Sequence, residues 1–162
     1  MIVALGADHA GFALKERLAR EIRAAGHRLL DCGAFDAKPS DYPDWARAVA
    51  AAILGGRAAR GVLVCGSGVG AAIAASKIPG IRAGVCHDAF SARQGVEDDD
   101  MNVLCLGARV VGPELAATAL RAFLAARFSR AARHRRRVGK VAAIERDACA
   151  GAFRRPGRRR ER

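Results

Sequence analysis

The chain has 162 residues, of which 51% are hydrophobic and 5% aromatic, and its formal net charge at pH 7 is +12. This length suits one domain, and no run reaches the roughly 18 apolar residues of a membrane span. The first residues enter a strand-like run without a basic leader, so no signal peptide is expected and the protein is predicted to be cytoplasmic. The five cysteines lack CxxC spacing. We interpret Cys32, Cys86 and Cys105 as small buried side chains of a reducing compartment.

The positive charge is concentrated towards the C-terminus. Residues 1–126 carry 14 Lys or Arg against 13 Asp or Glu, whereas residues 127–162 carry 14 against 3. Residues 151–162 are rich in arginine and have no apolar periodicity, which predicts a basic, disordered tail outside the domain. Because no aromatic side chains lie between these basic residues to stack on bases, nucleic-acid binding is not expected.

Apolar runs typical of strands alternate along the chain with segments of helical spacing. Strands are expected at residues 2–6, 27–32, 61–65, 81–86 and 102–106. Helices are expected at residues 10–25, 41–54 with Asp41 as the cap, 68–77, 89–96, 113–126 and 131–148. This alternation predicts an α/β fold, a doubly wound, Rossmann-like sheet of five parallel strands flanked by helices, with a basic helix at the C-terminal end.

Polar side chains gather where the predicted strands end. In a doubly wound sheet, ligands bind beyond the carboxyl ends of the strands. The polar residues at these positions are Asp8, His9, Cys65, His87, Asp88, Asp98, Asp99 and Arg109. We therefore expect the functional site at this edge of the sheet, although Asp8 is equally placed to cap the first helix.

Glycine recurs at every second position after Cys65, at Gly66, Gly68 and Gly70. Backbone amides in such a strand-to-helix turn can hold an anion, and the thiol beside them is a potential base. The spacing differs from the dinucleotide fingerprint, which follows the first strand of its sheet. The loop is thus predicted to hold one small anion, and a tight turn without a ligand is the alternative.

Arg133 and Arg137 lie four residues apart on the last predicted helix and therefore share a face. Two guanidinium groups placed in this way can bind one phosphate. Arg135 and Arg136 lie between them, and a basic helix is usually a solvated surface. The residues alone leave both interpretations open.

Together these motifs resemble the ribose-5-phosphate isomerase B family, which includes the isomerases of allose and galactose 6-phosphates. The matching segments are residues 6–12, 41–43, 65–70, 75–77, 80–82, 102–109 and 133–137. Because the likeness extends from residue 2 to about residue 147, residues 1–150 are predicted to form a sugar-phosphate isomerase domain.

The resemblance implies interconversion of D-ribose 5-phosphate and D-ribulose 5-phosphate through a cis-enediolate, without a metal or organic cofactor. It implies a homodimer, or a dimer of dimers, with active sites shared between subunits. Cys65 falls at the position of the catalytic base, which moves a proton between C1 and C2. The residues implied to bind substrate are Asp8, His9, Gly66, Ser67, Gly68, Val69, Gly70, Asp99, Arg109, Arg133 and Arg137.

One departure from the family pattern concerns Asp98. Many members carry histidine there, and that histidine is implied to open the sugar ring by protonating its oxygen. An aspartate is normally ionised at neutral pH and is a poor proton donor. Three hypotheses follow: slow ring opening through water, a substitute acid such as His87 or His134, or a different preferred substrate. The alternative functions are therefore a hexose-6-phosphate isomerase and a sugar-phosphate-binding protein with weakened catalysis.

Overall fold

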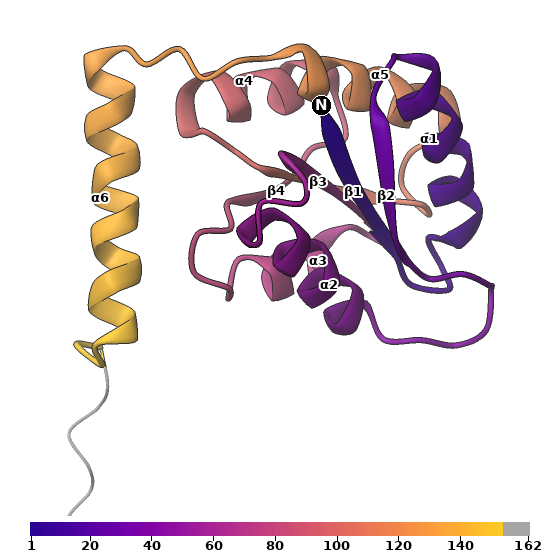
Figure 1. Ribbon diagram of the computed structural model, residues 1–162, viewed down its shortest axis with the longest axis horizontal. Coiled ribbons are helices and arrows are strands. Elements are labelled where there is room, and N and C mark those ends of the chain that lie inside the picture. The colour runs from indigo at the N-terminus through magenta and orange to yellow at the C-terminus, as the bar shows by residue number, and fades with distance from the viewer. Residues whose placement is uncertain (154–162) are drawn as a thin grey trace, which may run out of the picture.

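A single parallel sheet forms the centre of the protein (Figure 1). In the computed structural model, which describes residues 1–153, the strand order is β2-β1-β3-β5-β4. The strands are β1 (Ile2–Ala7), β2 (Arg28–Gly33), β3 (Arg60–Cys65), β4 (Ala83–Val85) and β5 (Val103–Gly107). The predicted α/β fold with five parallel strands is confirmed.

Helices cover both faces of the sheet. One face packs against α1 (Phe12–Ala24), α4 (Ala89–Asp99) and α5 (Pro113–Ala125), and the other against α2 (Tyr42–Leu54) and α3 (Val69–Ala75). Side chains alternate between the two faces along each strand. On β3, Val62 and Val64 join the first core cluster, whereas Leu63 and Cys65 join the second. The Cys65 side chain therefore belongs to the face covered by α2 and α3.

The last helix, α6 (Ala132–Cys149), stands apart from these layers (Figure 1). It meets the body at two points: His134 lies against Asp98 of α4, and the Gly80 N–H donates to Glu145 Oε1 at 3.0 Å. Between these points Val141 and Ile144 remain 54% and 59% exposed. Within residues 1–153, no helix combines the length and apolar character needed to cross a membrane.

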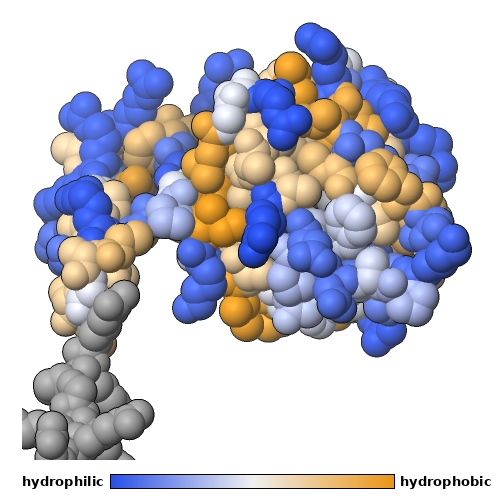
Figure 2. All heavy atoms as spheres, turned by 60° about the horizontal axis from the view of Figure 1, so that its bottom comes forward, coloured by the Kyte–Doolittle hydropathy of each residue, from blue (hydrophilic) through white to orange (hydrophobic). Residues whose placement is uncertain are grey.

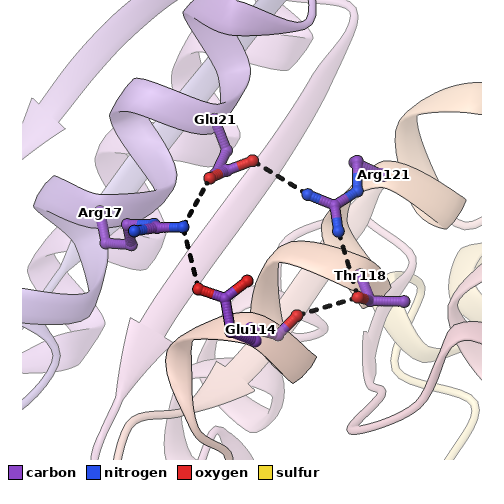
Figure 3. Close-up of polar contacts among 5 residues, drawn as sticks. All are labelled: Arg17, Glu21, Glu114, Thr118 and Arg121. Carbon is purple, nitrogen blue, oxygen red and sulfur yellow. Dashed lines mark hydrogen bonds and ion pairs between the residues drawn. The ribbon is translucent and has the colours of Figure 1, made fainter.

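A charged network on the surface joins α1 to α5 (Figure 3). Glu21 of α1 accepts from Arg17 and from Arg121, each at 3.0 Å, and Arg17 also bonds Glu114 of α5 at 3.0 Å. Thr118 accepts from Arg121 at 3.2 Å. Exposed pairs of this kind contribute at most about 1 kcal/mol each, so the apolar contacts beneath them supply most of the α1–α5 stability.

The structure corrects the predicted boundaries of two elements. The predicted strand 81–86 contracts to Ala83–Val85, because the Arg82 N–H donates to the Asn102 side chain at 2.8 Å instead of to a neighbouring strand. The helix predicted to end at 96 continues to Asp99 and stops at Asp100, whose φ is 52°.

Two further predictions concern the ends of segments. Asp41 precedes α2 as expected, but its side chain makes no capping hydrogen bond. The predicted tail lies mostly outside the described residues, so its disorder stays a prediction.

Candidate active site

The carboxyl ends of β1, β3 and β5 surround a cavity of about 390 Å³. Its walls come from the turn after β1, the glycine loop after β3, the turn after β5 and the start of α2. The lining residues are Asp8, His9, Ala10, Tyr42, Cys65, Gly66, Ser67, Gly70, Arg109 and Val110. The edge of the sheet predicted to carry the site is therefore where the structure places this cavity.

Cys65 is the last residue of β3 and is 4% exposed. Its Sγ accepts a hydrogen bond from the Gly68 N–H at 3.1 Å. Gly68 has a φ of 82°, and an added Cβ would approach the Leu106 carbonyl carbon to 3.0 Å. Glycine is needed here both for its positive φ and for the close backbone contact, and the resulting turn directs an amide at the sulfur.

Asp8 and His9 follow β1 in a turn that is tied to β3. The Asp8 N–H donates to the Val64 carbonyl at 3.2 Å, and Asp8 Oδ1 accepts from the Gly11 N–H at 3.0 Å. The carboxylate thus closes the turn before α1 and also lines the cavity, but the N-cap of α1 is Gly11 and has no side-chain capping hydrogen bond, so the capping alternative for Asp8 is wrong. His9 Nδ1 lies 3.1 Å from the Ser40 carbonyl oxygen and 3.2 Å from the Ser40 amide nitrogen.

Backbone hydrogen bonds join the turn after β5 to the end of β3 and the glycine loop. The Arg109 N–H donates to the Gly66 carbonyl at 2.9 Å, and the Ala108 N–H donates to the Cys65 carbonyl at 2.8 Å. A Cβ on Gly66 would lie 3.6 Å from Nη1 of Arg109, so the guanidinium lies over this glycine. Together with His9, which also lines the cavity, Arg109 gives it two side chains suited to an anion, and Asp8 gives it one acceptor suited to hydroxyls.

Tyr42 is a cavity residue that the search for polar strand ends missed. An added Cβ on Gly70 would lie 2.8 Å from the Tyr42 ring, so the tyrosine packs directly over this glycine. The only signal in the sequence was the segment 41–43 of the family resemblance. The contact itself joins two helices and follows from their packing.

The structure does not gather all the predicted site residues around this cavity. Two of the predicted loop residues do not line the cavity. The Gly68 amide contacts the Cys65 sulfur, and Val69, the first residue of α3, is 50% exposed. Asp98 and Asp99 lie on α4, and Arg133 and Arg137 lie on α6. These four residues do not line the cavity around Cys65 within one chain.

Asp98 is held by its neighbours. Its Oδ2 accepts from Gln94 Nε2 at 2.8 Å, and its Oδ1 lies 3.2 Å from His134 Nδ1. His134 is 3% exposed, and its Nε2 accepts from Arg133 Nε at 2.9 Å. Its hydrogen is therefore on Nδ1, where Asp98 and the Ser129 hydroxyl at 2.7 Å are the partners.

The two histidines considered as substitute acids are both engaged. Both ring nitrogens of His134 have partners, and His87 Nε2 accepts the Gly107 N–H at 3.1 Å. That bond leaves the hydrogen of neutral His87 on Nδ1. The structure therefore gives no support to His134 as the acid and leaves only one nitrogen of His87 for such a role.

Cys86 and Cys105 are buried thiols that lie outside the cavity around Cys65. Desolvation raises the pKa of Cys86 and of Cys105, and nearby cysteines add to the effect at Cys105. These thiols stay protonated at neutral pH, and neither lines the cavity around Cys65. Within residues 1–153, no group of three or more His, Cys, Asp or Glu side chains is arranged to hold a metal ion.

A second cavity, of about 770 Å³, separates α6 from the body. Apolar side chains gather on the side of the body that faces the helix (Figure 2). Ile81 and Met101 line the cavity from the body, and Val138, Val141 and Ile144 line it from α6. Asp99 lines the same cavity, which places it on the α6 side of the molecule.

Comparison with known proteins gives consistent matches over nearly the whole chain. Residues 3–141 match the family model described as Ribose/Galactose Isomerase. The chain is 43% identical to ribose-5-phosphate isomerase B of Escherichia coli, over 88% of this chain and 95% of that protein. It is 41% identical to D-erythrulose-4-phosphate isomerase of Pectobacterium atrosepticum, over 78% and 84% of the two chains.

The solved structure of Clostridium thermocellum ribose-5-phosphate isomerase B matches with a TM-score of 0.89 and 41% identity, over 91% of this chain and 99% of that one. Fold, site and relatives together define the class of the protein, which is an aldose–ketose isomerase built on a parallel α/β sheet. The chain belongs to the Ribose/Galactose Isomerase family. The resemblance inferred from the motifs is thereby confirmed.

Proposed function

We propose that the protein interconverts D-ribose 5-phosphate and D-ribulose 5-phosphate through a cis-enediolate, without a cofactor. The observation that carries this proposal is the meeting of Cys65, Asp8, His9 and Arg109 around one cavity. A thiol base, a hydroxyl acceptor and two anion-binding groups are what a phosphorylated sugar requires. The similarity to ribose-5-phosphate isomerase B of E. coli supports the pentose substrate.

In the proposed reaction Cys65 is the base. As thiolate it removes the proton from C2 of the open-chain aldose, and the C1 carbonyl oxygen takes the negative charge of the enediolate. A proton then passes from the C2 oxygen to the C1 oxygen, and the thiol returns its proton to C1 to give the ketose. The backbone amides of the loop from Gly66 to Gly70 stabilise the charge on the oxygen.

The proposed orientation of the substrate follows from the charges around the cavity. Arg109 and His9 bind the phosphate end or the hydroxyl beside it, because they are the arginine and the histidine among the cavity residues and such side chains form charge-assisted hydrogen bonds to phosphate. The Asp8 carboxylate accepts from a sugar hydroxyl. In this orientation the reacting carbons, C1 and C2, lie next to Cys65.

We further propose that a second copy of the chain completes each site. Arg133 and Arg137 lie on α6, which is covered by the body only near its two ends, and Val141 and Ile144 beside the open cavity are more than half exposed. A copy of the same chain packed into this cavity would cover them and bring its own arginines to the neighbouring Cys65. A C2 interface exchanges such contributions in both directions.

The test of the reaction is Cys65→Ala. General-base catalysis contributes about 10²–10⁴ in rate, so kcat should fall by that factor while ribose 5-phosphate still binds in calorimetry. Cys32→Ala, a thiol outside the cavity, is the matched control and should keep wild-type turnover. Near-normal turnover by Cys65→Ala would remove the proposed base, and binding without turnover by the wild type would support a sugar-phosphate-binding protein.

The test of sharing is complementation between two inactive variants. In a dimer formed from one Cys65→Ala chain and one Arg137→Ala chain, one site has both residues intact if the arginine acts across the interface. Random mixing should then restore about a quarter of wild-type activity. No recovery, in mixtures whose subunit exchange is verified by mass spectrometry, would place Arg137 in the site of its own chain.

A second candidate is a four-carbon substrate, and Asp98 is the observation that favours it. A tetrose 4-phosphate has its C4 oxygen esterified, so it cannot close a furanose ring and needs no ring-opening acid. Asp98 already accepts from Gln94 and lies against His134, and the P. atrosepticum relative is named for D-erythrulose 4-phosphate.

Turnover of erythrulose 4-phosphate, ribose 5-phosphate, allose 6-phosphate and galactose 6-phosphate, measured side by side, decides between these candidates. A higher kcat/KM for the four-carbon compound would select the second candidate. A higher value for ribose 5-phosphate would select the first, and a preference for either hexose phosphate would overturn both.

A further inference from the structure

Lys15 is a charged side chain in the interior that has no part in the proposed reaction. It lies on α1 and is 0% exposed. Its Nζ donates to both carboxylate oxygens of Asp31, at 2.7 and 2.9 Å, and lies 3.1 Å from Glu16 Oε1. The rings of Phe12 and Phe35 lie 5.5 and 5.6 Å from the ammonium. A buried lysine is costly unless it is paired in this way, which raises the question of what the pair holds in place.

The Lys15–Asp31 pair fixes the start of the segment 34–41, which joins β2 to α2. Asp31 Oδ1 also accepts the Gly33 N–H at 2.9 Å, and the following Ala34 N–H donates to the Ala7 carbonyl at 2.7 Å. Ala7 immediately precedes Asp8 and His9. The buried pair therefore sets the path of the segment where it passes the turn that carries two cavity residues.

Trp45 contacts the same segment near both of its ends. Its ring packs against Gly33, where an added Cβ would lie 2.6 Å from a ring carbon, and meets the Phe35 ring edge-on at 6.3 Å. Its Nε1–H donates to the Ser40 hydroxyl at 3.1 Å. The indole thus links Gly33, at the start of the segment, to Ser40 near its end.

Ser40 is the residue that contacts His9. Nδ1 of His9 faces both the carbonyl oxygen and the amide nitrogen of Ser40, at 3.1 and 3.2 Å. When Nδ1 carries a hydrogen it can donate to the carbonyl, and when it does not it can accept from the amide. The ring orientation is therefore supported in either protonation state, and Nε2 is left for a ligand.

We propose that the segment 34–41 is a support that positions His9 for the phosphate of the substrate, and that Lys15, Trp45 and Ser40 are its positioning residues. Two branches lead from Lys15 to Trp45, one through Phe35 and one through Asp31 and Gly33. From Trp45 the contacts continue to Ser40 and then to His9. This proposal rests on the proposed role of His9 as a phosphate-binding residue. Displacement of a binding group by about 1 Å can cost 10²-fold, so a remote support of this kind is measurable.

The first test is Lys15→Met, which keeps the length of the side chain but removes the ammonium. KM for the sugar phosphate and the inhibition constant of inorganic phosphate should both rise about tenfold or more, with kcat changed less than about threefold. Lys38→Met is the control, because Lys38 lies in the same segment with its side chain 85% exposed. That variant should match the wild type in all three constants.

The second test separates positioning from general destabilisation. If Lys15 acts through His9, Lys15→Met should have no further effect on the phosphate inhibition constant in a His9→Asn background, because the two changes share one pathway. Equal losses in both backgrounds, or no loss in either, would overturn the proposal. Ser40→Ala, which removes only the hydroxyl that accepts from Trp45 Nε1–H, gives the same cycle if Lys15→Met does not fold.

The outcomes also distinguish this proposal from the proposed function. If His9→Asn itself leaves phosphate inhibition unchanged while Cys65→Ala abolishes turnover, the support proposal is wrong and the isomerase reaction stands. If Cys65→Ala retains turnover, the proposed reaction fails whatever the phosphate constants show.

Discussion

Gly11 offers a quantitative test of how closely the turn after β1 is fitted to β3. Its backbone φ is −92°, which any residue adopts, so Gly11→Ala acts through space alone. The added Cβ would lie 2.6 Å from the Val64 carbonyl carbon, where ordinary contact begins at 3.4 Å. Because the Val64 carbonyl oxygen lies closer still, relief requires a displacement of at least about 0.8 Å, and it must come from the turn because Val64 is fixed in the central strand.

This displacement should appear in both stability and turnover. Overpacking of this extent costs about 1–3 kcal/mol of unfolding free energy. The same turn carries Asp8 and His9, and a misplacement near 1 Å can cost about 10² in rate. We therefore expect kcat/KM of Gly11→Ala to fall by about 30- to 100-fold, measured by a coupled isomerase assay beside urea unfolding.

Gly112→Ala is the matched control for Gly11→Ala. An added Cβ at Gly112 meets no atom within 4 Å, and a change at this helix cap should cost under about 1 kcal/mol. Its turnover should be that of the wild type. Wild-type kcat/KM in Gly11→Ala would refute the reasoning, because the turn would then tolerate the shift without consequence for the site.

Asp98→His should raise kcat/KM for ribose 5-phosphate by about 10² and leave that for erythrulose 4-phosphate unchanged; a uniform change would show that position 98 does not act on the sugar ring. Hydrogen bonds from Ser91 lower the pKa of Asp88 at the start of α4, so this carboxylate stabilises the fold above its unfolded-state pKa, near 3.9, and loses that effect as pH falls. Unfolding curves of Asp88→Ala and wild type should accordingly differ at pH 7 and converge at acid pH. Glu21→Gln removes the negative charge from both of its arginine pairs and should cost about 0.5–1 kcal/mol at low salt and less in 1 M NaCl; an undiminished cost in salt would mean that packing, not charge, is lost. Deletion of residues 151–162 should leave isomerisation intact and abolish any salt-sensitive RNA binding, whereas loss of turnover would assign the tail to the domain.

The order of strands and helices was predictable because apolar periodicity reflects burial directly. The exact residues at which the elements begin and end were less predictable. The apolar Ile81 favours a strand, but the Asn102 side chain accepts a hydrogen bond from the neighbouring Arg82 N–H and the strand is shorter as a result. The helix α4 continues to Asp99 and ends where Asp100 adopts a left-handed backbone conformation. The local sequence pattern does not predict this conformation.

Within the site, strand-end positions predicted the residues that the backbone places directly. Asp8, Cys65 and Arg109 each lie at or just after the end of a strand, so topology alone brings them together. Tyr42 was missed because its place depends on how α2 packs against Gly70. Lys15 was missed because a lysine within a helix pattern reads as solvated, and its burial depends on Asp31 in another element.

The arginines of α6 show a different reason for incomplete prediction. Their spacing indicates a shared face, but no property of a single chain determines which cavity that face approaches. Arg133 donates to the buried His134 in this structure, whereas the proposed site needs it beside another copy. The complementation of Cys65→Ala by Arg137→Ala therefore tests the assignment of this face.

The central place of β3 has a consequence for how substrate range changes in this family. The sulfur of Cys65 inherits its position from a strand hydrogen-bonded to β1 on one side and β5 on the other, so a slip of one residue would turn it to the opposite face. The walls around it come from turns and from the first residues of helices. Mutation can therefore reshape the pocket for a shorter or longer sugar while the sulfur proposed as the base stays where the sheet holds it.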